Sequence, residues 1–86
     1  MFDVYFSNKA KKQFDNFENK YKEQIQECLK LLMTDPVPAK KYDLKKLSGI
    51  EDSFRIRIGK IRAVYNIDWK KKEIIIARIE SRETVY

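Results

Sequence analysis

Residues 54–67 read FRIRIGKIRAVYNI, and this stretch decides the fold. Apolar side chains alternate with charged or small ones on both sides of Gly59-Lys60, which is typical of two half-buried strands. Glycine at the first position of a two-residue loop supplies the positive φ that such a loop needs. The stretch therefore predicts an antiparallel hairpin that turns at Gly59-Lys60.

A two-residue turn also fixes the register of this hairpin. Arg57 then pairs with Arg62, and Arg55 pairs with Val64. Because side chains alternate between the two faces of a strand, one face of the hairpin is apolar and can be covered by helices. Its members are Phe54, Ile56, Ile58, Ile61, Ala63 and Tyr65. The other face carries Arg55, Arg57 and Arg62.

The predicted pairing of Arg57 with Arg62 places two positive charges side by side. Such a pair destabilises a sheet by a few tenths to ~1 kcal/mol. Charge on a solvent-facing strand is ordinary for any one arginine. Three arginines on one hairpin face favour a second interpretation, because arginine donates paired hydrogen bonds that match phosphate. We expect this face to hold the phosphates of a polyanion.

The rest of the chain predicts helices before the hairpin and one strand after it. A short strand at residues 2–6 precedes Ser7, which can cap the first helix. A second helix is expected over residues 19–33 and ends before Pro36, because proline disfavours helix in the preceding residue. Residues 37–53 are expected to be a lysine-rich connector, and strands are expected at 53–58, 61–67 and 73–80. The predicted fold is a single α+β domain, 1–86, with an antiparallel-rich four-stranded sheet and a two-helix hairpin on one face.

The last predicted strand extends the charged face. If Ile75, Ala77 and Ile79 face the helices, alternation places Arg78 and Glu80 beside the hairpin arginines. Glu80 is then expected to be the only acid there. It is either the counter-ion of Arg78 or a carboxylate available for proton transfer.

Composition narrows the classes of function. The net charge of +6 favours polyanionic partners such as RNA. The single Cys28 cannot form an internal disulfide, which favours a reducing, cytoplasmic setting. The chain has no histidine, the usual neutral-pH proton shuttle and zinc ligand, so no metal and no small-molecule cofactor are expected. No apolar run approaches the ~20 residues of a membrane span and no signal peptide is recognisable, so no membrane role is expected.

Two segments, LKKLSGIEDSFRIRIGKIRAVYNI (44–67) and ARIESRETVY (77–86), together resemble the RelE/ParE toxin superfamily of toxin–antitoxin pairs. The likeness is greatest to the RelE branch. It lies in a Leu-Ser-Gly segment before an aromatic-Arg-Ile-Arg strand, in the Arg-x-x-Tyr pattern of residues 62–65, and in the Arg-x-x-Val-Tyr ending of residues 82–86. The resemblance covers essentially the whole chain.

The resemblance implies a ribosome-dependent endoribonuclease that cleaves mRNA in the ribosomal A site without a metal. By position, Arg55 and Arg57 match the basic pair of the first hairpin strand, and Arg62 matches the arginine of the second. Arg82 and Tyr86 match the C-terminal pair. Ser81 stands where many relatives have histidine, so the general acid and base are left open.

From the residues and the resemblance together, two groups of side chains are expected to form the site. The expected catalytic residues are Arg57, Arg62, Arg82, Tyr86 and Glu80. The expected RNA-binding residues are Arg55, Arg78, Lys45, Lys46 and Lys60. For most of the lysines, a merely solvated surface is the simpler interpretation. Tyr86 either stacks on a base, donates a proton, or packs at the domain edge.

The resemblance implies three partners: mRNA, the ribosome, and a cognate RelB-like antitoxin with acidic and amphipathic segments. Two other functions fit the same scaffold. One is a ParE-like inhibitor of DNA gyrase, which binds a protein and does no chemistry. The other is an inactive RNA-binding relative, which the absent histidine suggests.

Overall fold

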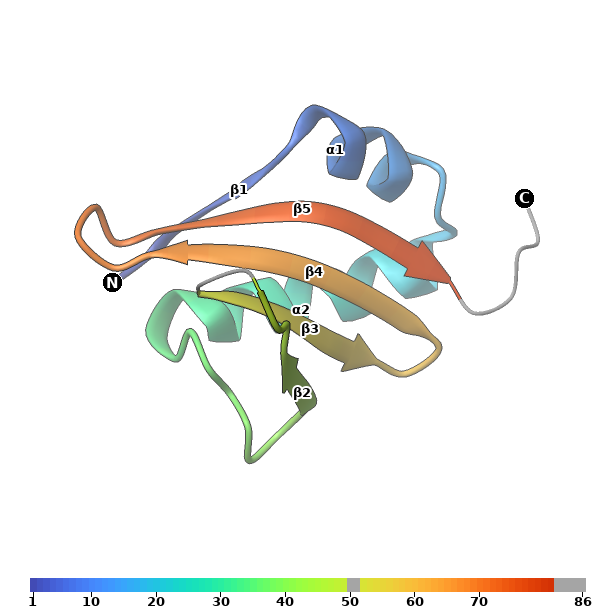
Figure 1. Cartoon of the computed structure of the whole chain (residues 1–86). Coiled ribbons are helices and arrows are strands. Elements are labelled where there is room, and N and C mark those ends of the chain that lie inside the picture. Colours follow the sequence, from blue (N-terminus) through green and yellow to red (C-terminus); the bar gives the residue numbers. More distant parts are fainter. Residues whose placement is uncertain (50–51, 82–86) are drawn as a thin grey trace.

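A computed structural model of the chain describes residues 1–49 and 52–81 and shows two helices and a mixed sheet (Figure 1). The elements in chain order are β1 (Asp3–Phe6), α1 (Asn8–Asp15), α2 (Asn19–Thr34), β2 (Asp43–Lys46), β3 (Ser53–Ile58), β4 (Ile61–Asp68) and β5 (Glu73–Ser81). The strands lie in the order β1-β5-β4-β3-β2. β1 runs parallel to β5, and the other neighbours are antiparallel.

The predicted α+β class is confirmed, but the predicted count of four strands is wrong. The described sheet has five strands, and the additional one is β2, which lies inside the segment expected to be a connector. Its sequence, DLKK, has one apolar residue and three charged ones, so it carries no strand pattern of its own. The free edge of β3 supplies its hydrogen-bonding partner, and Leu44 of β2 lies opposite Ile56.

The predicted hairpin of β3 and β4 is confirmed in register. Ile58 pairs with Ile61 across the turn, and Arg57 pairs with Arg62. Gly59 has a φ of 60°, which a side chain would make unfavourable. The turn therefore fixes which side chains of both strands face the same way.

The two helices cover one face of the sheet, and the hydrophobic core lies between the helices and the sheet. In Figure 1, α2 passes behind β3 and β4, while α1 lies next to β5. The core side chains from the helices are Ala10, Phe14, Phe17, Ile25, Cys28 and Leu32. Tyr65 of β4 is fully buried beneath them, and its hydroxyl donates a hydrogen bond to the Pro36 carbonyl at 2.7 Å. This bond ties the segment after α2 to the middle of the sheet.

A β-bulge in β5 changes which side chains of that strand are buried. Tyr65 pairs with Ile76 and Val64 pairs with Arg78, so Ala77 is the additional residue. Ile76 is buried before the bulge and Ile79 after it, three residues apart instead of two. The expectation that Ile75 faces the helices is therefore wrong, whereas Ile79 is buried in the core as expected. Ile75, 36% exposed, lies on the opposite face.

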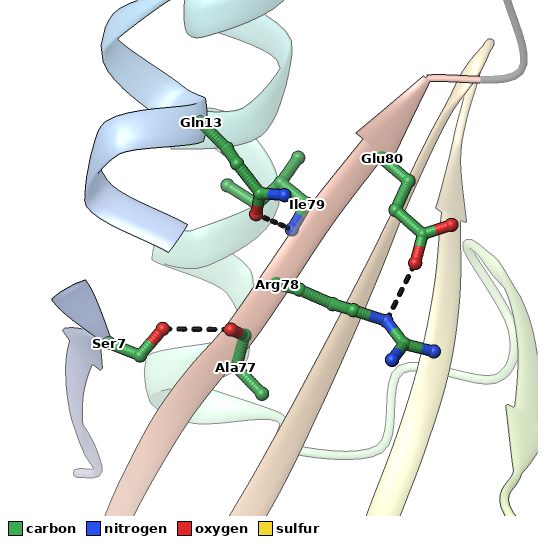
Figure 2. Close-up of polar contacts among 6 residues, drawn as sticks. All are labelled: Ser7, Gln13, Ala77, Arg78, Ile79 and Glu80. Carbon is green, nitrogen blue, oxygen red and sulfur yellow. Dashed lines mark hydrogen bonds and ion pairs between the residues drawn. The ribbon is translucent and has the colours of Figure 1, made fainter. Parts of the chain in front are cut away.

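Polar side chains from the start of the chain satisfy the backbone at this bulge (Figure 2). β1 ends at Phe6, so among the described residues β5 has no strand partner on that edge beyond Ile76. Ser7 Oγ donates to the Ala77 carbonyl at 2.8 Å and accepts from the Ala10 N–H at 3.0 Å. The second bond confirms Ser7 as the N-cap of α1. The Ile79 N–H donates to Gln13 Oε1 at 2.7 Å.

The Gln13→Ala substitution should lower the free energy of unfolding by about 1–3 kcal/mol, because it leaves the Ile79 N–H without its acceptor. Gln26→Ala is the matched control, since Gln26 is an exposed glutamine of α2. Urea unfolding followed by circular dichroism measures both variants. Equal unfolding midpoints for Gln13→Ala and the control would show that the bulge does not depend on this bond.

Burial also perturbs the titration of two core groups. Removal from water raises the pKa of the Cys28 thiol to about 12, although a hydrogen bond with Tyr42 acts in the other direction. Burial likewise raises the pKa of Tyr65, and the nearby Cys28 and Asp35 add to the effect. Both groups are therefore neutral in the folded protein over a pH range in which the unfolded chain ionises.

Stability should fall as the pH rises above 9.0, the ordinary pKa of the thiol, because the unfolded chain loses the Cys28 proton first. Below that pH both states keep the proton, and this contribution is fully present. Urea titrations at pH values on both sides of 9.0 measure the effect. Cys28→Ala should show a shallower alkaline decline than the unsubstituted protein; an identical decline would contradict the assignment to the thiol.

Candidate nucleic-acid interface

The face of the sheet away from the helices carries the arginines, and we call it the arginine face. Its side chains form rows that cross the strands in register. The first row is Asp43, Arg57, Arg62 and Glu80, and the second row is Lys45, Arg55, Val64 and Arg78. Successive rows are two residues apart along each strand, which is roughly 7 Å. Four arginines from three strands thus lie within two adjacent rows.

Two of these arginines form ion pairs within the arginine face. Arg78 Nε lies 2.6 Å from Glu80 Oε1 (Figure 2), which agrees with the interpretation of Glu80 as a counter-ion. Arg57 Nη1 lies 3.7 Å from Asp43 Oδ2. The expectation that Glu80 is the only acid on this face is therefore wrong. Asp43 was missed because it belongs to β2, which pairs with β3 without a strand pattern of its own.

Arg55 and Arg62, the other two arginines of this face, differ from Arg57 and Arg78 in their contacts with acidic side chains. Within residues 1–49 and 52–81, neither Arg55 nor Arg62 takes part in an ion pair. Arg62 Nε is shielded from solvent and has no hydrogen-bond partner in the same part of the chain. A buried donor without an acceptor is costly, at about 1–3 kcal/mol. An anion bound next to Arg62 would remove that cost.

The remaining predicted site residues lie in different places. Lys45 lies on the arginine face opposite Arg55. Lys46 pairs with Phe54, so alternation places it on the helix side of the sheet, away from the arginines. Lys60 is exposed in the hairpin turn. Arg82 and Tyr86 lie outside the described residues.

Trp69, in the loop between β4 and β5, packs against the end of the sheet. Its indole N–H donates to Asp52 Oδ1 at 3.1 Å, and its ring meets Phe2 edge-on with centroids 5.5 Å apart. The ring is nevertheless 48% exposed.

A groove lies between the edge strand β1 and α2. This groove has a volume of about 680 Å³, and Tyr5 of β1 and the apolar side chains of Leu29 and Met33 line it. Three carboxylates, those of Asp3, Glu23 and Glu27, also line it. An acidic groove does not suit a phosphate, so the arginine face is the candidate surface for a nucleic acid.

Comparison with known proteins agrees with this geometry. The family model of the ParE toxin of the type II toxin–antitoxin system parDE matches residues 4–86. The chain belongs to the RelE/ParE toxin superfamily. It is 40% identical over 63 residues to toxin RelE1 of Methanocaldococcus jannaschii, a match that covers 73% of this chain and 70% of RelE1. The predicted resemblance to RelE-type toxins is therefore confirmed, and the chain is a toxin of the type II class.

Solved structures of this superfamily have the same fold. The archaeal RelE–RelB complex from Pyrococcus horikoshii OT3 contains a chain that matches with a TM-score of 0.86 and 28% identity, over 98% of each chain. The intact E. coli RelBE toxin–antitoxin complex gives a TM-score of 0.80 at 20% identity, over 96% of this chain and 99% of that chain. The second likeness shows the shared fold alone.

No helix among the described residues is long and apolar enough to cross a membrane.

Arg62→Gln should leave the protein folded, with a free energy of unfolding that is unchanged or raised by a few tenths to ~1 kcal/mol. The reason is that the substitution removes a like-charged cross-strand neighbour of Arg57. Lys12→Gln, at an exposed lysine of α1, is the charge-matched control. Urea unfolding compares the two variants. A loss of the circular dichroism signal of the sheet in Arg62→Gln would refute the placement of Arg62 outside the core.

Proposed function

We propose that this toxin is a ribosome-dependent endoribonuclease that cleaves mRNA in the ribosomal A site and thereby blocks translation. The observation that carries the proposal is the group of four arginines on one face of the sheet. One of them, Arg62, has a shielded Nε for which the described residues supply no acceptor. The match to toxin RelE1 supports the same function.

The reaction needs little from the protein beyond positioning and positive charge. The 2′-oxygen of the RNA attacks the adjacent phosphorus, and the bond from phosphorus to the 5′-oxygen breaks. The products are a cyclic phosphate and a 5′-hydroxyl, and the proton lost by the 2′-hydroxyl is balanced by the one that the 5′-oxygen gains. Negative charge builds up on the phosphorane, and fixed cationic donors stabilise it more than they stabilise the substrate.

Arg62 and Arg57 are the residues that we assign to this charge. They are direct cross-strand neighbours, so one phosphate can reach both guanidinium groups. The contact of Arg57 with Asp43 is 3.7 Å long, and both side chains are largely exposed. Such a pair contributes about 0–1 kcal/mol, so an incoming phosphate can displace Asp43. Arg55 and Lys45, one row away, would hold the neighbouring backbone.

The described residues are less well suited to transfer protons than to stabilise negative charge. Glu80 accepts a hydrogen bond from Arg78 Nε at 2.6 Å, so its carboxylate holds Arg78 in place and is less available as a base. Arginine itself is a poor acid, because its pKa is above about 12. Arg82 and Tyr86 keep the roles that the resemblance implies. A site of this kind depends on accurate alignment of the RNA, which the ribosome would supply.

The proposed partner outside the ribosome is a cognate antitoxin. The structures from Pyrococcus horikoshii and E. coli are both complexes of RelE with RelB. We propose a RelB-like antitoxin for this chain, with acidic and amphipathic segments that cover the arginine face. Residues 1–86 would act as a single toxin domain in the cytoplasm, where mRNA is translated.

A gyrase inhibitor is the second candidate function, because the matching family model is that of the ParE toxin. Such a protein would use the same fold to bind a protein surface. The arginine face favours the ribonuclease, since a row of closely spaced arginines suits successive phosphates. An inactive RNA-binding relative would share that face but lack turnover.

Primer extension on a defined mRNA tests the proposal, with purified protein in the presence and absence of programmed ribosomes. Cuts should appear only with ribosomes. Arg62→Ala should reduce the cleavage rate by about 10²–10³-fold, which is the usual effect of removing one donor to a developing anion. Lys12→Ala, at an exposed lysine of α1 on the helix side of the sheet, should cleave like the unsubstituted protein.

The absence of ribosome-dependent cuts would refute the proposal that the protein is a ribonuclease. A supercoiling assay with purified gyrase would then test the second candidate directly. Equal cleavage by Arg62→Ala and the unsubstituted protein would support the ribonuclease activity but refute the assignment of Arg62 to its site.

A further inference from the structure

We propose that the third row of the arginine face is a shelf that binds one unpaired RNA base, with Tyr5 as the stacking surface. The proposal rests on the proposed function in one respect, namely that RNA lies on this face. The row consists of Tyr5 in β1, Ile75 in β5, and Asn66 in β4 with its partner Ser53 in β3. We call it the base shelf.

Tyr5 and Ile75 form the apolar part of the base shelf. They are cross-strand partners in the parallel pair of β1 and β5, so their side chains lie next to each other on the same face. Tyr5 is 47% exposed and Ile75 is 36% exposed, which places both among the few large apolar side chains that the described surface shows to solvent. An aromatic ring with an aliphatic neighbour offers a flat surface on which a base of any kind can stack.

Asn66 supplies the polar part. It pairs with Ile75 on one side and with Ser53 on the other. The Ser53 hydroxyl donates a hydrogen bond to Asn66 Oδ1, and Ser53 is buried, with 1% of its surface exposed. This bond engages the amide oxygen and orients the side chain. The Nδ2 group of the exposed Asn66 then presents N–H donors to an acceptor on the edge of a base.

The spacing of the rows suits a single RNA strand. Asn66 lies four residues from Arg62 along β4, which is roughly 13 Å at about 3.3 Å per residue. The second row, with Arg55 and Arg78, lies between them. A strand whose phosphates lie on the first two rows can therefore place a base on the third.

The charge on the next row favours a base over a phosphate at the shelf. The fourth row consists of Asp3, Asp68 and Glu73, which are in register across β1, β4 and β5. A phosphate on the base shelf would lie beside these carboxylates, whereas a base is neutral. The change from arginines to carboxylates thus separates the part of the face suited to the RNA backbone from the part suited to a base.

A protein partner is the less favoured occupant of the shelf. Two exposed apolar side chains are few for a specific protein interface, which buries about 800 Å² on each partner. The shelf is also continuous with the arginine rows, which suit a polyanion.

Fluorescence anisotropy with a short, labelled single-stranded RNA at low salt tests the shelf without any cleavage. The comparison uses a second oligonucleotide that has the same backbone but no bases. Tyr5→Ala should weaken binding of the base-bearing RNA by about 5- to 150-fold, the usual range for loss of one stacking contact. It should leave binding of the abasic strand unchanged. Tyr5→Phe should bind both strands like the unsubstituted protein.

Asn66→Asp is the second variant, because a carboxylate still accepts from Ser53 but has no N–H donors. It should weaken binding of the base-bearing RNA more than binding of the abasic strand. Circular dichroism confirms that each variant is folded.

The results separate this inference from the proposed function. A base-dependent loss in Tyr5→Ala supports the shelf even if the protein makes no cuts on ribosomes. Unchanged binding by Tyr5→Ala overturns the shelf, even if primer extension establishes the ribonuclease. The shelf is also overturned if the unsubstituted protein binds both strands equally or neither strand. Unchanged RNA binding together with loss of antitoxin binding by Tyr5→Ala would assign the patch to the protein partner.

Discussion

The β-bulge at Ala77 is the feature on which the rest of the sheet depends. It lets β5 bury Ile76 and Ile79 in one core although they are three residues apart. The same shift places Arg78 and Glu80 on the face with Arg62. β1 ends before this part of β5, and Ser7, the N-cap of α1, and Gln13 within α1 bind the backbone of Ala77 and Ile79 instead (Figure 2). The start of the chain therefore holds the strand that completes the arginine face.

The arginine face is a compromise between stability and binding. Arg57 and Arg62 are adjacent like charges, which is unfavourable in the free protein. Asp43 and Glu80 reduce the repulsion by pairing with Arg57 and Arg78, but among the described residues no acid pairs with Arg55 or Arg62. The face is thus partly neutralised, which keeps the sheet stable and leaves two arginines for an anion. In the proposed function, that anion is the phosphorane that forms during cleavage.

The rest of the sheet's open face gives this arginine surface a boundary. Two rows of basic side chains are followed by the base shelf and then by a row of carboxylates. A sheet can arrange unlike chemistry in this order because each row takes one residue from each of three or four neighbouring strands. The acidic groove between β1 and α2 adjoins the last two rows, because Tyr5 and Asp3 line it as well. The fold therefore places the arginines at one end of the open face and the carboxylates at the other.

The sequence by itself determined the hairpin, its register and the arginine side of it, because a two-residue turn and strict alternation act within a few residues. It also determined Ser7 as a cap and the order of the two helices. Only the tertiary structure decided β2, since DLKK becomes a strand by pairing with β3. The sequence did not predict the bulge at Ala77 either, because the isoleucines at 74–76 allow either face of the strand to be buried. The bonds from Ser7 and Gln13 to the backbone of β5 form only in the folded protein. The sequence also did not place three residues on the open face of the sheet, because they lie there through pairing between strands that are distant in sequence. These residues are Asp43, Ile75 and Tyr5.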